Sequence, residues 1–169
     1  MMIFELPQRK HKEMFQAYKE EFHYHHETFI HGDGGCSGYD DFEEWVKISE
    51  NYREGKCLPE GYVPSTTYFL IEGDYIVGVV NIRHELNESL LKIGGHVGYS
   101  VLPSYRRQGI ATKILMFAIE KCHELGIGEI LVTCDENNIG SRKTIEKCGG
   151  ILENKLKVDN KVSLRFWIK

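Results

Sequence analysis

The first third of the chain carries apolar residues at the spacing of helices. Between residues 8 and 29 they recur every three or four positions, which predicts an amphipathic helix, and a similar pattern over 40–53 predicts a second helix. The segments 31–38 and 56–65 contain glycines or prolines in polar surroundings and predict loops. A short apolar run at 3–6 allows a strand before the first helix.

After residue 65 apolar and polar residues alternate, as they do in strands. Two such runs, 66–72 and 75–84, are separated by Gly73-Asp74, a dipeptide typical of a hairpin turn, and Asp159-Asn160 separates the last two runs in the same way. The other expected elements are a strand over 95–102, a helix over 108–125, a strand over 129–134, a helix over 139–148 and strands over 151–158 and 162–168.

This order of elements predicts a mixed α/β fold with one central sheet flanked by helices. The segment 95–134 is a strand-helix-strand unit, which predicts a parallel pair with a right-handed crossover, while both hairpins predict antiparallel neighbours. No repeat or linker divides the chain. We therefore expect one domain over 1–169, with the N-terminal strand and helices in 1–65 and the sheet in 66–169.

Composition and charge narrow the classes of partner. Hydrophobic residues make up 41% and charged residues 27% of the chain, as in ordinary globular proteins. The formal net charge is -4, so no overall attraction to nucleic acid or to an anionic membrane is expected. There is no basic segment before a long apolar stretch and no run of about 18 apolar residues, which predicts a cytoplasmic protein.

The five cysteines are odd in number and form no C-x-x-C pair. Three of them lie in apolar, periodic segments. Free thiols, mostly buried, are therefore expected rather than a disulfide framework or a zinc ribbon.

A strand and a helix meet between Val101 and Leu115 in a join that carries two arginines. The join is Arg106-Arg107-Gln108-Gly109-Ile110-Ala111, so a glycine and a small residue stand at the start of the helix. The first N–H groups of a helix have no partner within it, and a phosphate can approach them where side chains are small. The pattern predicts an anion site or, more simply, a solvated helix start. A nucleotide-binding loop is disfavoured because the Walker lysine and hydroxyl are missing.

These residues resemble the signature of the GNAT superfamily of N-acetyltransferases, in which R/Q-x-x-G-x-G/A opens a helix after a Val-x-Pro-like turn. A second stretch, from Asn138 through Ser141 to Gly149-Gly150, is similar to a later motif of that superfamily. The resemblance covers about 66–169, whereas the two N-terminal helices match only in type. The G-G-H-V-G-Y and I-R-H-x-L-N stretches resemble uncharacterised predicted acetyltransferases of bacteria.

The resemblance implies a GNAT-like acyl-CoA N-acyltransferase fold with a splayed central mixed sheet. Acetyl-CoA would lie between the parted strands, with its pantetheine arm along the first of them and its pyrophosphate at the helix start. No metal is implied. The residues expected to bind acetyl-CoA are Ser100, Val101, Leu102, Arg106, Arg107, Gln108, Gly109, Ile110, Ala111, Thr112, Asn138 and Ser141.

The implied reaction is direct acetyl transfer from the thioester to a primary amine of a small molecule or peptide. Many members of the superfamily protonate the departing thiolate with a tyrosine seven residues after the asparagine, where this chain has Ile145. Either Tyr99, Tyr105 or a water would then serve instead, or the thiolate would leave unassisted. Candidate bases are His96, Tyr99, His84 and Glu72. His96 is either the base or a buried structural histidine, depending on which way its strand faces.

Acceptor-binding residues are expected at the end of the second hairpin strand. Arg83, His84 and Asn87 stand there, and Arg83 or Asn87 could order a carboxylate or amide of the acceptor. A histidine-rich segment, 23–31, is expected to line or cover the acceptor pocket, with a metal cluster as the weaker interpretation.

Three other functions stay open at this stage. The domain could transfer a larger acyl group, bind acyl-CoA as a sensor without turnover, or bind a nucleotide. The last hairpin could also pair with a second copy of the chain in a homodimer.

Overall fold

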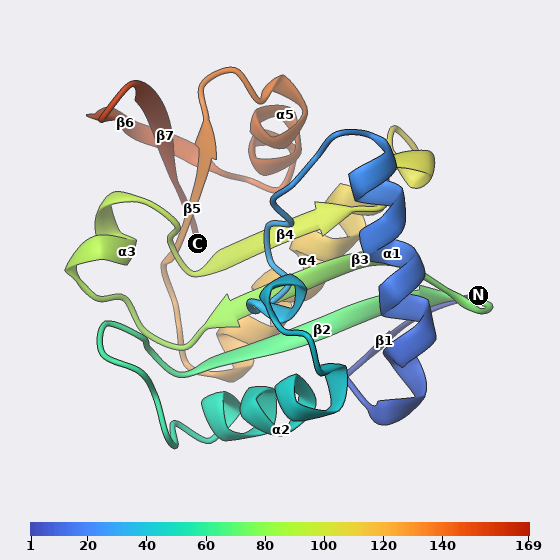
Figure 1. Cartoon of the computed structure of the whole chain (residues 1–169). Coiled ribbons are helices and arrows are strands. Elements are labelled where there is room, and N and C mark those ends of the chain that lie inside the picture. Colours follow the sequence, from blue (N-terminus) through green and yellow to red (C-terminus); the bar gives the residue numbers. More distant parts are fainter.

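Seven strands form two antiparallel sheets in the computed structural model, which describes residues 1–169 (Figure 1). The first sheet has the order β1-β2-β3-β4 and the second the order β5-β7-β6. The strands are β1 (Met2–Glu5), β2 (Ser65–Glu72), β3 (Tyr75–Arg83), β4 (Val97–Val101), β5 (Ile130–Asp135), β6 (Ile151–Val158) and β7 (Lys161–Ile168).

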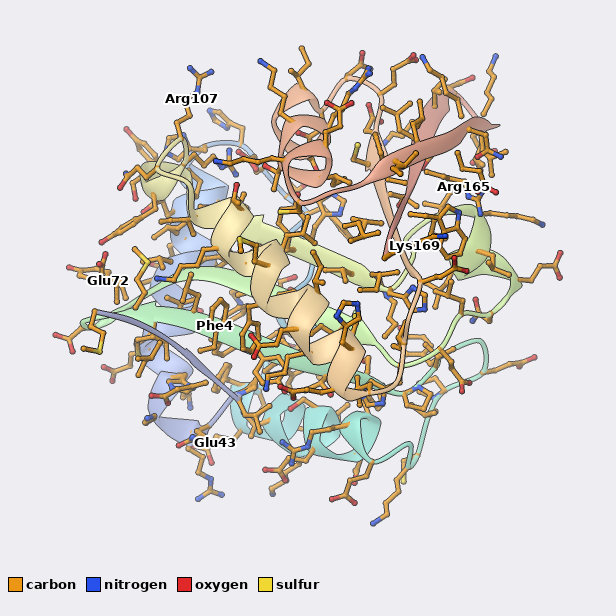
Figure 2. All side chains as sticks on the ribbon, turned by 180° about the vertical axis from the view of Figure 1, so that it is seen from behind. Phe4, Glu43, Glu72, Arg107, Arg165 and Lys169 are labelled. Carbon is orange, nitrogen blue, oxygen red and sulfur yellow. The ribbon has the colours of Figure 1, made fainter.

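Helices cover both faces of the first sheet. On one face lie α1 (Lys12–Tyr24) and α2 (Phe42–Arg53) (Figure 1), and on the opposite face lies α4 (Ile110–Glu124), seen from behind in Figure 2. The short helix α3 (Glu88–Lys92) precedes β4, and α5 (Ile139–Lys147) packs beside α4. Three-residue 3-10 turns occupy Arg9–His11, Cys36–Gly38 and Pro103–Tyr105.

The alternation of side chains along β2 divides the interior into two hydrophobic clusters. Phe69 and Ile71 belong to the cluster under α1 and α2, together with the fully buried Trp45. Leu70 points the other way, into the cluster under α4. Phe4 of β1 stacks on Phe117 of α4 at 3.7 Å between ring centroids (Figure 2). The period of two read in the sequence therefore fixes both faces of the sheet.

The two sheets part between β4 and β5. Their only bridge joins Gly95 to Val132, just before β4 begins, and it is antiparallel. The predicted parallel ladder is therefore wrong, although the predicted splayed α/β fold is confirmed. Beyond the bridge the edges of β4 and β5 have no strand partner. The helix α4 connects β4 to β5 along the chain. Its first turn faces the space between the two parted strand edges.

Several boundaries differ from the sequence expectation. α1 ends at Tyr24 rather than near residue 29, and His26 has a positive φ of 60°, which no helix continues. The helix α3 was not predicted; it begins where the Asn87 side chain accepts a hydrogen bond from the Leu90 N–H. All five cysteines are free, and three are buried, but Cys57 is exposed. No helix of the structure is both long and apolar enough to span a membrane.

Candidate functional site

A cleft of about 460 Å³ lies where the edge of β4 faces the first turns of α4 and α5. It holds most of the residues that the sequence analysis assigned to acetyl-CoA, but not Leu102, which is buried under α1, nor Gln108, which is exposed and bonds back to Ser104. The cleft is lined by Phe22, Glu27, Phe29, His31, Tyr99, Ser100, Val101, Tyr105, Arg106, Arg107, Gly109, Ile110, Ala111, Thr112, Asn138, Gly140, Ser141 and Thr144.

The free edge of β4 offers main-chain groups to this cleft. Leu102 donates its N–H to the Val77 carbonyl, and the His96 carbonyl accepts from the Arg83 N–H, so both residues bond toward β3. Because successive residues of an antiparallel strand bond alternately to either side, Gly98 and Ser100 also bond toward β3, while Tyr99 and Val101 turn their N–H and carbonyl groups outward. The outward groups are therefore those of Tyr99 and Val101, rather than the expected Ser100 and Leu102.

The first turn of α4 presents an uncapped set of N–H groups. Gly109 is the N-cap with a φ of 79°, a conformation that glycine adopts without strain, and no side chain caps the helix. A Cβ atom built on Gly109 would meet nothing within 4 Å, so the approach to the helix start is open. Arg107 stands beside it with its side chain in solvent (Figure 2). These features suit a bound phosphate.

Arg106 lines the cleft, but its charge is already paired. Its two terminal nitrogens donate to the carboxylate of Glu27 at 2.6 and 2.8 Å, and its Nε donates to the Val101 carbonyl. The guanidinium also lies over the ring of Phe22, 5.5 Å from its centroid. The hydrogen bond from Arg106 lowers the pKa of Glu27, which keeps the pair charged. Arg106 thus ties the segment after α1 to the β4–α4 connection, and Arg107 is the arginine beside the helix start that keeps its charge unpaired.

The first turn of α5 closes the other side of the cleft. The Asn138 side chain caps this helix by accepting the Ser141 N–H, and the Ser141 hydroxyl lies 3.0 Å from the hydroxyl of Tyr99. Burial raises the pKa of Tyr99 to about 12, so its phenol stays protonated at neutral pH. Ile145, where the superfamily often has tyrosine, is fully buried in the hydrophobic cluster under α4.

His96 holds the two sheets together at the point where they meet. Its backbone N–H donates to the Leu131 carbonyl, and its Nδ1 accepts the Leu131 N–H at 2.9 Å. The side chain is buried and lines neither this cleft nor the cavity described below. Burial, reinforced by the charge of Arg83, lowers the pKa of His96 to about 4. Of the two interpretations open from the sequence, the geometry favours the structural histidine.

The role of His96 predicts a specific loss of stability in acid. The unfolded state takes up a proton near pH 6.5 and the folded state only near pH 4, so the free energy of unfolding falls as the pH drops between these values, by at most about 3 kcal/mol. In His96→Asn the side-chain oxygen can accept the Leu131 N–H without titrating. Urea unfolding at pH 7 and pH 4.5 should show a smaller loss for this variant. Equal losses in the two proteins would refute the assignment.

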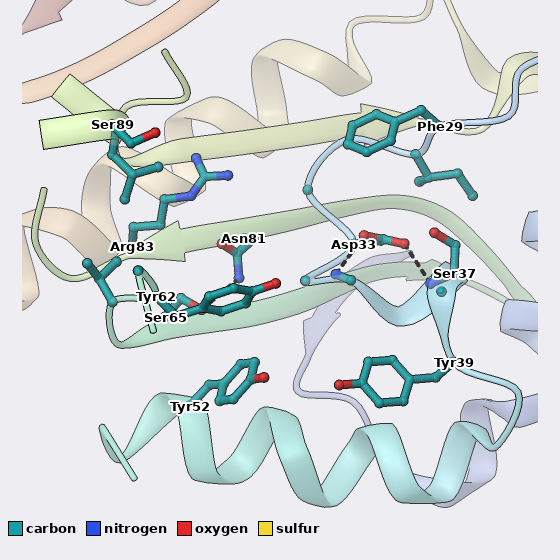
Figure 3. Close-up of a pocket in the computed structure, with 18 of the residues that line it drawn as sticks. Phe29, Asp33, Ser37, Tyr39, Tyr52, Tyr62, Ser65, Asn81, Arg83 and Ser89 are labelled. Carbon is teal, nitrogen blue, oxygen red and sulfur yellow. Dashed lines mark hydrogen bonds between the residues drawn. The ribbon is translucent and has the colours of Figure 1, made fainter. Parts of the chain in front are cut away.

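A second cavity, of about 600 Å³, opens on the α1–α2 side of the first sheet (Figure 3). The segment that follows α1 separates it from the cleft: Gly32 packs so closely on β4 that a Cβ atom there would lie 2.2 Å from the Gly98 carbonyl oxygen. Phe29 lines both spaces. The cavity and the cleft are therefore neighbours on either side of one loop.

Two of the three residues expected to bind the acceptor line this cavity. Arg83 and Asn87 do, whereas the His84 ring is turned away and bonds to the Thr66 hydroxyl at 2.8 Å, which makes it a structural group. Glu72 pairs with Met2 at the far end of β2 and lines neither space. The histidines at the end of α1 are exposed, and no group of three or more potential metal ligands comes together in the structure.

Sequence reasoning placed His31 in a histidine-rich segment expected to line or cover the acceptor pocket, but assigned it no role of its own. It lies on the separating loop, lines the cleft, and its ring meets that of Phe29 at 4.6 Å, while the next residue, Gly32, lines the cavity. The ring is exposed to the cleft, yet the surrounding protein desolvates it enough to lower its pKa below the usual 6.5. A neutral imidazole therefore stands between the two spaces. The only signal in the sequence was a histidine beside a glycine-rich loop.

Comparison with known families agrees with this geometry. Residues 5–150 match the sequence profile of the acetyltransferase (GNAT) family. The chain belongs to the GNAT family of acetyltransferases. The expected family and the expected enzyme class, an acyltransferase, are thereby confirmed. No curated protein sequence matches the chain significantly.

Solved structures with the same fold are GNAT acetyltransferases of low sequence identity. A ribosomal-protein-S5-alanine acetyltransferase from Vibrio fischeri is 14% identical, with a TM-score of 0.72 over 99% of this chain and 92% of that one. The microcin C7 self-immunity acetyltransferase MccE, solved with acetyl-CoA and AMP, is 16% identical, with a TM-score of 0.71 over 99% and 91%. An enzyme from Salmonella typhimurium that modifies the N-terminal serine of ribosomal protein L7/L12 is 16% identical, with a TM-score of 0.67 over 99% and 94%.

Proposed function

We propose that this GNAT protein transfers the acetyl group of acetyl-CoA to a primary amine held in the neighbouring cavity. The observation that carries the proposal is the joining of three features on one cleft: an unpaired strand edge, an uncapped helix start and an adjoining cavity. Acetyl-CoA supplies an acetyl group activated as a thioester, and the amine supplies the nucleophile.

The residues of the cleft suit the two ends of acetyl-CoA. The outward N–H and carbonyl of Tyr99 and the outward N–H of Val101, whose carbonyl already accepts from the Arg106 Nε, can bond to the pantetheine amides as a neighbouring strand would. The N–H groups from Ile110 to Thr112, together with Arg107, can bind the pyrophosphate. An N–H group on the edge of β4 can also stabilise the negative charge that develops on the acetyl oxygen.

The proton transfers can be assigned to two side chains. The C–N bond forms as the C–S bond breaks, so one proton must leave the amine and one must reach the departing sulfur. We assign the first transfer to His31, which stands between amine and cleft in its neutral form. We assign the second to Tyr99, whose hydroxyl lies against Ser141, one helical turn before Ile145 on α5. Tyr105 lines the cleft too, but nothing holds its hydroxyl there.

Tyr99→Phe tests the proton donor. Without the hydroxyl the thiolate must leave unassisted, so kcat should fall by about a hundredfold. The Tyr105→Phe variant serves as the control, because that ring also lines the cleft. Release of free thiol, measured continuously, gives both rates. Equal kcat values for the Tyr99 variant and the wild type would remove Tyr99 from the mechanism.

Two measurements test the function itself. Acetyl-CoA should raise the melting temperature, and addition of amines should release free thiol with one acetylated product for each thiol. A protein stabilised by acetyl-CoA that acetylates no amine would instead be an acyl-CoA sensor, the alternative favoured by the burial of Ile145 in the core. Absence of any stabilisation by acetyl-CoA would refute both functions.

Two further expectations stay predictions. The outer strand of the second sheet, β6, exposes Ile151 and Leu152, which would suit pairing with a second copy in a homodimer. Sedimentation of the protein at several concentrations tests it, and a monomer throughout would rule it out. A cytoplasmic location is likewise proposed from the sequence pattern alone.

A further inference from the structure

We infer that the cavity selects an acceptor whose amine is accompanied by a carboxylate, namely a free amino acid with an apolar or aromatic side chain. The inference rests on the proposed function and names the substrate class of that site. It follows from three polar groups of the cavity whose bonding within the protein is incomplete, and from the aromatic side chains around them.

Arg83 is a cation without a counter-ion. Its Nη1 donates to the carbonyls of Gly94 and Gly95, which fixes the guanidinium in place, but it forms no ion pair with any carboxylate of the protein. Its Nε and Nη2 have no partner, and the side chain lines the cavity. A held guanidinium with free N–H groups is the usual partner of a carboxylate.

Asn81 offers a hydrogen-bond acceptor on the same side of the strand. Only 6% of this residue is exposed, and its Nδ2 is bonded to the hydroxyls of Ser65 and Thr67. The side-chain oxygen accepts no hydrogen bond from the protein, although the side chain lines the cavity. No buried side-chain nitrogen or oxygen of the structure lacks a partner, so this oxygen is accessible from the cavity and suits an N–H donor of the ligand.

Asp33 adds a negative charge near the side-chain oxygen of Asn81. Both its oxygens accept backbone N–H groups, from Gly35 and Ser37 at 2.8 Å each, and no cation of the protein pairs with it. In Figure 3 Asn81 lies between Asp33 and Arg83. The cavity thus has a negative side at Asp33 and a positive side at Arg83. These charges complement the ammonium and carboxylate groups of a zwitterion.

The order of these groups along β3 orients the acceptor. Asn81 is paired with Gly98 of β4, on which Gly32 and the loop carrying His31 are packed, so an amine bonded to Asn81 would lie beside the proposed base. Arg83 stands two residues farther along the same face. Its Nη1 is held by the Gly94 and Gly95 carbonyls, and its free Nη2 lies beside Gly98, 3.3 Å from where a Cβ atom there would stand. The carboxylate would therefore bind next to the amine, at the Arg83 end of the cavity.

Aromatic rings form the remaining wall. Phe29 and three tyrosines, 39, 52 and 62, line the cavity, and the rings of Tyr52 and Tyr62 are 5.8 Å apart between centroids (Figure 3). Such a wall favours an apolar or aromatic side chain on the acceptor. A peptide N-terminus, by contrast, carries an amide where the free amino acid has its carboxylate.

The test compares three forms of each of two acceptors, phenylalanine and methionine. Each amino acid is assayed beside its own α-carboxamide, which stands in for a peptide N-terminus, and beside its own decarboxylated amine. Two readings are taken: kcat/KM from thiol release, and the shift in melting temperature produced by each compound in the presence of CoA. We expect the free amino acid to exceed both analogues by about tenfold or more in kcat/KM and to give the largest shift.

Variants assign the preference to Arg83. Arg83→Met should bring the ratio of kcat/KM for the amino acid to kcat/KM for the amine close to one. The control is Arg9→Met, because Arg9 is exposed and lines neither the cleft nor the cavity. This variant should keep the ratio of the wild type. Because Arg83 also supports Gly94 and Gly95, the fold of its variant is checked by its melting temperature with CoA. If that variant fails to fold, the discrimination by the wild type decides the matter.

The outcomes separate this inference from the function on which it rests. If the amide or the amine is bound and acetylated as well as the free amino acid, the inference is wrong while the acetyltransferase function stands. If no compound is acetylated but the amino acids still shift the melting temperature most, the inference holds and the enzyme function fails. If neither amino acid binds better than its analogues, the inference fails whatever the activity.

Discussion

Gly109→Glu is expected to weaken the binding of acetyl-CoA by about a hundredfold or more. The new carboxylate would stand at the uncapped start of α4, where it can accept the N–H groups itself and repel the pyrophosphate. A hundredfold loss corresponds to about 2.7 kcal/mol, within the reach of one lost anion site together with charge repulsion. Isothermal titration with acetyl-CoA measures the change.

A matched control lies at the other end of the same helix. Gly126 follows the last turn of α4, has the same φ of 79° as Gly109, and a Cβ atom there would also meet nothing within 4 Å. Gly126→Glu therefore imposes a similar backbone strain and the same charge far from the cleft. If both variants weaken binding equally, the effect comes from a distorted helix, and the phosphate site does not lie at the start of α4.

His31→Gln is expected to lower kcat by about a hundredfold, the usual contribution of a general base. Glutamine keeps much of the size and polarity of histidine but cannot take up the proton of the amine. The matched control is His25→Gln, because His25 is exposed on the same segment and lines neither space. Single-turnover rates with saturating acetyl-CoA separate this loss from a loss of binding.

The pH dependence gives a second reading on the same residue. A base must be unprotonated, so activity is lost as the pH falls through its pKa, which burial places below 6.5 for His31. The wild type should therefore show an acid limb below about pH 6.5 that the His31→Gln variant lacks. An unchanged limb and an unchanged kcat would together assign the base elsewhere.

The helix start of α4 was predictable because its chemistry is local. The proposed anion site consists of the backbone between residues 106 and 111, and the glycine at this helix start is visible in the sequence. The same holds for the Asn138 cap of α5, a contact between residues three apart. Most helices and strands were predictable for the same reason, since their periods express which face of each element is buried.

The pairing of β4 and β5 was not predictable in this way. A strand-helix-strand unit normally yields a parallel ladder, but here His96 fills the junction by bonding both its backbone and its ring to Leu131. Those bonds hold the strands together at one end, and the edges beyond it are left free. The hydrogen bond between the His96 ring and the Leu131 N–H, a contact across 35 positions, therefore favours a structural role for His96 over a catalytic one.

Contacts across long sequence distances also redistributed the charges. Glu27 and Arg106 are 79 positions apart, and their pairing neutralises one of the two arginines that the sequence analysis had assigned to the phosphates. It also fixes the loop that carries His31 and Gly32 over β4. The cavity then collects Asp33, Asn81 and Arg83 around a space that no local pattern announces.

The sequence by itself thus determined the family, the layers of the fold and the open helix start that we propose for the phosphates of acetyl-CoA, because these depend on short-range periodicity and on one helix terminus. Only the tertiary structure decided which histidine lines the cleft, which arginine keeps a free charge and which groups line the second cavity. Those properties depend on burial and on pairing between distant segments, and a side chain acquires both only when the chain has folded.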